Sequence, residues 1–123
     1  MKVKRSIDSA ARIVILEVSE HLGDAELLSL ADQLEKDPEV SSDFSLLIDL
    51  RQADGRDVTS AGVQALASRS LVLSRASRRA VVVPSDLGFG MARMCEMLSE
   101  RRGGSARVFR NHSEAMRWLE FGV

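Results

Sequence analysis

The apolar run at residues 45–50, SLLIDL, limits the possible folds of this 123-residue chain more strongly than any other segment. Its side chains do not alternate between apolar and polar, so a strand here must be covered on both faces. Such strands are typical of the centre of a parallel sheet, where helices pack on each side. The segment that follows turns polar and leads to a helical pattern from Thr59, as expected for an alternation of strands and helices.

The rest of the chain continues this alternation. β-Branched residues predict strands at 3–7 and 12–18, joined in a hairpin, and short apolar runs predict two more at 80–83 and 106–109. Helical spacing predicts helices at residues 25–36, 59–73 and 86–101, and a last one from residue 111. We therefore predict an α/β fold with a mixed, mostly parallel five-stranded sheet and about four helices, forming one domain over residues 1–123.

Residues that favour helix ends mark the limits of these helices. The predicted N-terminal caps are Asp24, Ser85 or Asp86, and Asn111 with Glu114, and the predicted stops are Pro38 and the Gly103–Gly104 pair. The last helix carries Ala115, Trp118 and Leu119 on one face, so we expect Trp118 to be buried against the sheet.

Composition and charge exclude several classes of function. Hydrophobic residues make up 45% of the chain and charged residues 28%, which is typical of a globular protein. The formal net charge is −1, so we expect no nucleic-acid partner. The apolar runs are too short for a transmembrane segment, and the N-terminal residues lack the apolar core of a signal peptide. The single cysteine, Cys95, excludes an intramolecular disulfide, and together these features predict a cytoplasmic protein.

The sequence carries few signatures of an enzyme. It contains neither of the glycine motifs that bind phosphates or dinucleotides, so no nucleotide cofactor is expected. His21 and His112 have no second ligand at metal spacing, and Cys95 has no histidine nearby. Ser60, His112 and Asp49 could be drawn as a catalytic triad, but their spacing gives this no support. We therefore predict a protein without catalytic activity, metal or cofactor.

Two hydroxyl residues, Thr59 and Ser60, lie at the start of the second predicted helix, after a buried strand and a polar loop. A helix N-terminus can hold a phosphate group, because its free N–H groups and its dipole favour negative charge. Many ordinary α/β turns have the same arrangement. We take Ser60, and after it Thr59, as the candidate phosphorylation or anion site, with a solvent-reachable hydroxyl in the first helical turn.

Two helices carry apolar residues that the amphipathic pattern does not explain. The second is apolar on almost every side, so either a neighbouring helix covers it or it forms a contact surface. In the third, Phe89 lies opposite the core face and beside Arg93, which makes both candidate interface or ligand contacts, unless the helix begins after Gly90 and Phe89 tucks inward. Met91 and Met94 lie on the core face, where they fill the core or line an adaptable pocket. The surplus apolar surface predicts a homodimer.

The order of elements, the LLIDL strand and the turn Thr59-Ser60-Ala61-Gly62 resemble the STAS domain family of anti-sigma-factor antagonists. In that family the matching turn reads D-S-S-G, and a partner kinase phosphorylates its first serine. The resemblance implies that Ser60 takes the phosphorylated position. This chain departs from the pattern, because Thr59 replaces the aspartate and Ala61 replaces the second serine.

The C-terminal half resembles the bacterial SpoIIAA-like proteins, which are related to STAS domains and, more distantly, to the CRAL-TRIO lipid-exchange fold. The matching segments are residues 79–83, 89–94, 108–110 and 115–119. These resemblances imply a non-enzymatic regulatory module that binds a protein partner, such as an anti-sigma factor or a kinase. The alternative that they leave open is a carrier or sensor of a small apolar ligand or lipid.

Overall fold

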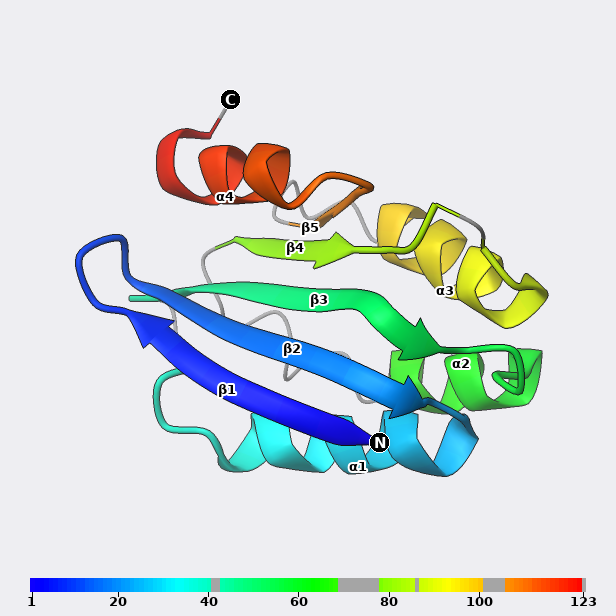
Figure 1. Ribbon diagram of the computed structural model, residues 1–123. Helices are drawn as coiled ribbons and strands as arrows, with labels where there is room; N and C mark the ends of the chain where they lie inside the picture. The colour runs from blue at the N-terminus through cyan, green and yellow to red at the C-terminus, as the bar shows by residue number, and fades with distance from the viewer. Residues whose placement is uncertain (41–42, 69–77, 86, 101–105, 123) are drawn as a thin grey trace.

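The computed structural model describes residues 1–40, 43–68, 78–85, 87–100 and 106–122. Five strands form one mixed sheet in the order β1-β2-β3-β4-β5, which is also their order along the chain (Figure 1). The first pair of strands is antiparallel, and all the later neighbours are parallel. The strands are β1 (Lys2–Asp8), β2 (Ile13–His21), β3 (Ser45–Asp54), β4 (Arg79–Val82) and β5 (Ala106–Phe109). The predicted fold class is confirmed.

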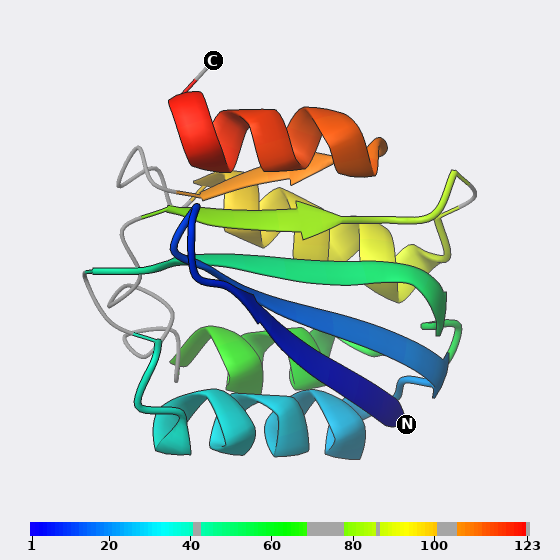
Figure 2. The same cartoon turned by 60° about the vertical axis from the view of Figure 1, so that its left-hand side comes forward.

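Three helices cover one face of the sheet and a fourth covers the other (Figures 1 and 2). α1 (Asp24–Lys36), α2 (Ser60–Ser68) and α3 (Phe89–Glu100) each connect two neighbouring parallel strands. Every connection moves one strand in the same direction, and right-handed crossovers then place all three helices on the same side. α4 (His112–Phe121) follows the edge strand β5 and packs back across β3, β4 and β5 on the opposite side.

The sheet separates two apolar clusters, and β3 contributes to both. Leu46 and Ile48 belong to the cluster under α1, α2 and α3, whereas Leu47 between them belongs to the cluster under α4. Every residue from 45 to 50 is buried, as the continuous apolar run predicted. Trp118 of α4 is only 5% exposed, and its ring centroid lies 5.8 Å from that of Phe109, so its predicted burial is confirmed.

Some boundaries differ from the predicted ones. β2 continues to His21 and β3 to Asp54, beyond their predicted ends at residues 18 and 50. The third helix begins at Phe89 and not near Ser85, because its first helical hydrogen bond runs from the Ala92 N–H to the Gly88 carbonyl, at 2.9 Å. The prediction of a cap at Ser85 was therefore wrong. Asp86, the Gly103–Gly104 pair and residues 69–73 of the second predicted helix lie outside the described residues.

The C-terminal end of α1 and both ends of α4 agree more closely with the sequence. The Asn111 side chain accepts a hydrogen bond from the Glu114 N–H at 3.1 Å, so the predicted cap of α4 is confirmed. The helix closes at Gly122, whose φ of 76° is the left-handed conformation that glycine adopts without strain. α1 ends at Lys36, shortly before Pro38, as predicted.

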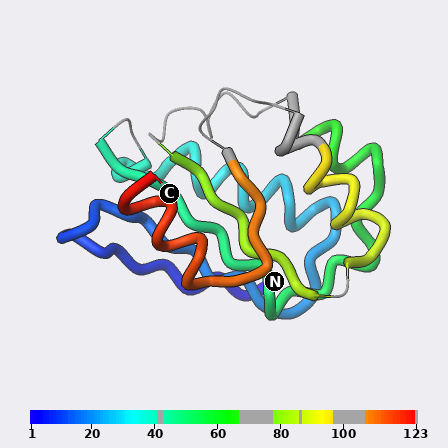
Figure 3. The backbone as a smooth tube through the Cα atoms, turned by 90° about the horizontal axis from the view of Figure 1, so that it is seen from above, coloured from blue at the N-terminus to red at the C-terminus, as the bar shows by residue number. Residues whose placement is uncertain are grey.

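Neighbouring helices cover much of the described part of α2. α1 and α3 both pack against it, and α2 and α3 lie side by side at one end of the molecule (Figure 3). Val63 is buried, Leu66 is half-buried and Ala61 is exposed. Of the two explanations for its apolar pattern, coverage by neighbouring helices therefore holds for residues 60–66.

Candidate functional site

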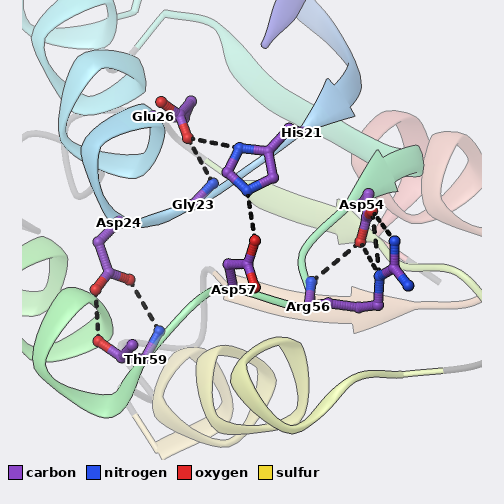
Figure 4. Close-up of polar contacts among 8 residues, drawn as sticks. All are labelled: His21, Gly23, Asp24, Glu26, Asp54, Arg56, Asp57 and Thr59. Carbon is purple, nitrogen blue, oxygen red and sulfur yellow. Dashed lines mark hydrogen bonds and ion pairs between the residues drawn. The ribbon is translucent and has the colours of Figure 1, made fainter.

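Two loops meet at the edge of the sheet where β2 and β3 end (Figure 4). Because these strands are parallel, their final residues lie side by side, and His21 pairs with Asp54. The residues that follow, 22–26 and 55–60, lead into the starts of α1 and α2. The carboxyl end of the strands is the edge at which open α/β sheets usually bind their ligands.

Asp24 binds the start of α2 through two hydrogen bonds to Thr59. The Thr59 N–H donates to Asp24 Oδ1 at 2.8 Å, and the Thr59 hydroxyl donates to Asp24 Oδ2. Thr59 Oγ1 also accepts from the Gly62 N–H at 3.1 Å, so Thr59 caps α2. The hydrogen bonds from the Thr59 hydroxyl and N–H lower the pKa of Asp24. Asp24 is therefore an ionised carboxylate that lies at the N-terminus of α2, although the residue itself belongs to α1.

Gly62 provides the space that this contact needs. A Cβ atom on Gly62 would overlap the carboxylate of Asp24. Any larger residue at position 62 would displace the carboxylate from Thr59. The glycine of the turn is thus required by a side chain from α1, and not by an unusual backbone angle.

The prediction that Asp24 caps α1 was wrong. Gly23 is the N-cap of α1, and its N–H donates to Glu26 Oε1 at 2.8 Å. Asp24 is the first residue of the helix. Its carboxylate is engaged by Thr59, 35 residues further along the chain, instead of by its own backbone.

His21 joins the same two loops by a second route. Its Nε2 lies 2.9 Å from Asp57 Oδ2, and its Nδ1 lies 3.1 Å from Glu26 Oε1. The hydrogen bond to Asp57 raises the pKa of His21, and the charge of Glu26 adds to this effect. When protonated, the imidazolium ring can donate to both carboxylates at once. The end of β2, the first turn of α1 and the loop before α2 are therefore connected by one side chain.

The loop between β3 and α2 is also held by its own contacts. The Arg56 guanidinium and backbone N–H both bind the Asp54 carboxylate, with Nη2 and Oδ2 2.8 Å apart. The Val58 N–H donates to the Gly55 carbonyl at 3.1 Å, which closes the turn. The backbone leading to Thr59 and Ser60 is thereby fixed before α2 begins.

Ser60 is the first residue of α2 and is half-buried. Among the residues that the structure describes, none is a hydrogen-bond partner of its hydroxyl. Ser60 directly follows Thr59 in the chain, so its backbone adjoins the residue that binds Asp24. The structure thus places both candidate residues at the start of α2. The Thr59 side chain caps the helix, whereas the Ser60 hydroxyl has no hydrogen-bond partner among the described residues.

The start of α3 lies against this loop. A Cβ atom on Gly90 would overlap the Val58 carbonyl oxygen, so only glycine allows this approach. Phe89, the neighbouring residue, is 69% exposed, and the Arg93 guanidinium lies over its ring at 4.8 Å from the centroid. Phe89 therefore points outward, at the same end of the molecule as Ser60, and does not tuck into the core.

Met91 and Met94 belong to the core. Met91 is 1% exposed and fills the space beside Gly55, and Met94 is also buried. Both side chains therefore lie on the core face of α3, as their helical spacing predicted. Met94 lines a small apolar cavity of about 40 Å³ beneath α1 and α2, together with residues such as Leu30, Leu50 and Leu66. That volume is close to the space of one water molecule, roughly 30 Å³, so a lipid chain has no room there.

The other singled-out residues lie apart from this edge. Asp49 is buried on the α4 side of the sheet and binds Arg51 at 2.7 Å, so it forms no triad with Ser60. Cys95 is half-buried in α3, and burial raises the pKa of its thiol.

The described residues contain no group of three or more potential metal ligands. In the same part of the chain, no helix combines the length and apolar character needed to cross a bilayer.

Solved structures share the fold of this chain. An uncharacterized protein of the DUF3478 family from Shewanella loihica PV-4, described as having a SpoIIAA-like fold, matches with a TM-score of 0.63 and 14% identity, over 96% of this chain and 92% of its own. The chain has the SpoIIAA-like fold. The anti-sigma factor antagonist SpoIIAA in its unphosphorylated form matches with a TM-score of 0.52 and 9% identity, over 92% of each chain. A scan of protein-family models and a search of curated proteins find no match.

Sequence reasoning identified Thr59, Ser60 and Phe89 but missed Asp24 and His21, which hold the start of α2 and the loop before it. Asp24 and His21 looked like a helix cap and an isolated histidine, because their partners are distant along the chain. The signal that could have identified them is the parallel pairing of β2 and β3. That pairing brings the residues after both strands to one edge of the sheet.

Proposed function

We propose that this chain is a non-enzymatic regulatory module that binds a protein partner through the Ser60–Phe89 surface. This surface consists of the loop at residues 55–59, Ser60 at the start of α2, and Phe89 with Arg93 on α3. We further propose that the module acts in the cytoplasm, and that phosphorylation of Ser60 by a partner kinase, with ATP as donor, regulates the binding. An anti-sigma factor is the partner that the SpoIIAA-like fold favours.

The exposure of Phe89 carries this proposal. Phe89 and Phe121 are the two large hydrophobic side chains that are strongly exposed in the described residues. Phe89 lies on the end of the molecule that carries Ser60, whereas Phe121 lies on α4, across the sheet. An exposed aromatic ring with an arginine stacked on it is typical of an interface contact. The contact between Gly90 and Val58 joins this ring to the loop that leads to Ser60.

The alternative of a lipid carrier receives no such support. The apolar cavity near Met94 is too small for an acyl chain, and a drug-sized ligand needs a pocket of roughly 300–1,000 Å³. Two wider grooves lie elsewhere, but charged side chains such as Arg5 and Glu96 line them. We therefore keep the interaction module as the single proposed function.

Site-specific photo-crosslinking in the native cells tests the proposal. A benzophenone amino acid replaces Phe89 in one variant and Phe121 in a matched control, because the two side chains are similarly exposed, at 69% and 67%. We expect a discrete adduct with another protein from position 89 and none from position 121. Equal labelling from both positions, or no adduct from position 89, would contradict the proposed surface.

A further inference from the structure

The position that an anion would take at the start of α2 is already filled by Asp24. Both donors of Thr59, the N–H and the hydroxyl, point to its carboxylate. Gly62 leaves room for that carboxylate, since any Cβ there would overlap it. The first turn of α2 therefore has its negative charge supplied from within the chain.

We propose that Asp24 controls whether position 60 can carry negative charge, because the Asp24–Thr59 contact and a charged group at Ser60 exclude each other. This inference rests on the proposed function, in which Ser60 is the regulated residue. It adds the mechanism by which a charge at Ser60 would change the module. The charge acts on the contact between α1 and α2.

The physical basis is repulsion between like charges at close range. Ser60 is the residue next to Thr59, and Thr59 binds Asp24 directly. A second negative charge at position 60 lies well inside the screening length of about 8–10 Å at ordinary ionic strength. The helix dipole favours negative charge at this end, but it amounts to only about half an elementary charge. Asp24 already takes up that favourable interaction.

The consequence reaches beyond Ser60, because Asp24 belongs to α1. The Asp24–Thr59 contact joins the first residue of α1 to the cap of α2, and the two helices pack against each other. A charge at Ser60 weakens this contact at the cap of α2. That cap directly follows Val58, whose carbonyl oxygen lies against Gly90, the residue next to Phe89. The uncharged and charged forms would then present different Ser60–Phe89 surfaces to a partner.

A double-mutant cycle on the full chain tests the inference without any partner. The four proteins are wild type, Ser60→Asp, Asp24→Asn and the double variant, and the readout is the melting temperature. Asp24→Asn removes the charge and keeps the shape of the side chain. We expect Ser60→Asp to lower the melting temperature by about 2–6 °C in the wild type. In the Asp24→Asn background it should leave the melting temperature unchanged or raise it.

Gln64→Glu is the matched control, because Gln64 is exposed one turn further along α2. Its effect on the melting temperature should be the same in the wild type and in the Asp24→Asn background. An equal shift from Ser60→Asp in both backgrounds would overturn the inference. The non-additivity should also shrink in 1 M NaCl, where the screening length falls to about 3 Å.

A second measurement covers the case in which Asp24→Asn does not fold. The pKa of Asp24 is followed by NMR titration in the wild type and in Ser60→Asp. We expect Ser60→Asp to raise the pKa of Asp24, and an unchanged pKa would contradict the inference. A failed cross-link at Phe89 combined with a positive cycle would refute the proposed function and leave the coupling in place.

Discussion

Asp24 and His21 connect loops that lie more than 30 residues apart in sequence, and each does so through a hydrogen bond that involves a carboxylate. Asp24 holds the cap of α2, and His21 holds Asp57 in the loop before it. Glu26 joins His21 to the cap of α1, since it accepts from the Gly23 N–H and lies against His21. The edge of the sheet is thus organised by a few side chains whose removal should have measurable effects.

Gly62→Ala should destabilise the protein, by about 1–3 kcal/mol, because the new methyl group overlaps the Asp24 carboxylate. Replacing glycine by alanine inside a helix normally stabilises it by roughly 0.5–1 kcal/mol, so the sign is reversed here. Denaturant unfolding measures the change. In an Asp24→Ala background the same substitution should become neutral or stabilising, and a loss of equal size there would contradict the assigned role of Gly62.

His21 should make the stability depend on pH. Its pKa is raised by the hydrogen bond to Asp57 and by Glu26, so its stabilising contribution is complete below the unfolded pKa of about 6.5. This contribution is lost as the pH rises through the higher folded pKa. The melting temperature of the wild type should therefore fall toward that of His21→Gln as the pH rises from about 6.5 through the folded pKa. If the melting temperatures of the two proteins changed in parallel with pH, His21 would not be the source of the pH dependence.

At the scale of the helices and strands, continuous apolar runs and capping residues predicted most of what the structure shows. Residues 45–50 and Asn111 behave as expected because burial on both faces and capping are set by nearby residues. The start of α3 could not be predicted from nearby residues. It depends on the close approach of Gly90 to the Val58 carbonyl, which lies far away in the sequence. The role of Asp24 was missed for the same reason. A polar residue before a helix favours a cap locally, whereas its actual partner is set by tertiary packing.

The docking of α4 depends largely on Trp118. Its ring packs against the sheet, and the Arg78 guanidinium donates to its carbonyl oxygen at 3.2 Å. Trp118→Ala should cost about 3–5 kcal/mol, a large share of the roughly 5–15 kcal/mol that stabilises a typical domain. Trp118→Phe, which keeps an aromatic ring, should cost clearly less in the same unfolding experiment. Red-shifted native fluorescence that iodide quenches readily would instead place the ring in water.

At the scale of the whole molecule, we expect the chain to form a two-fold homodimer, because exposed apolar side chains favour self-association. Phe89 is the strongest candidate contact among the described residues. Sedimentation velocity at rising concentration should show dimers, and Phe89→Ser should weaken them while Phe121→Ser does not. A single monomeric species at high micromolar concentration would contradict this prediction. A dimer that uses Phe89 would also compete with the protein partner.

The central claim is that charge at Ser60 regulates binding at the Ser60–Phe89 surface. It is tested most directly by the yield of the cross-linked adduct from position 89 in three further variants, Ser60→Ala, Ser60→Asp and Gln64→Glu. We expect Ser60→Ala and Gln64→Glu to retain the yield of the parent protein. Ser60→Asp should change it by about tenfold, the effect of roughly 1.4 kcal/mol of binding free energy. Equal yields from Ser60→Ala and Ser60→Asp would contradict the claim.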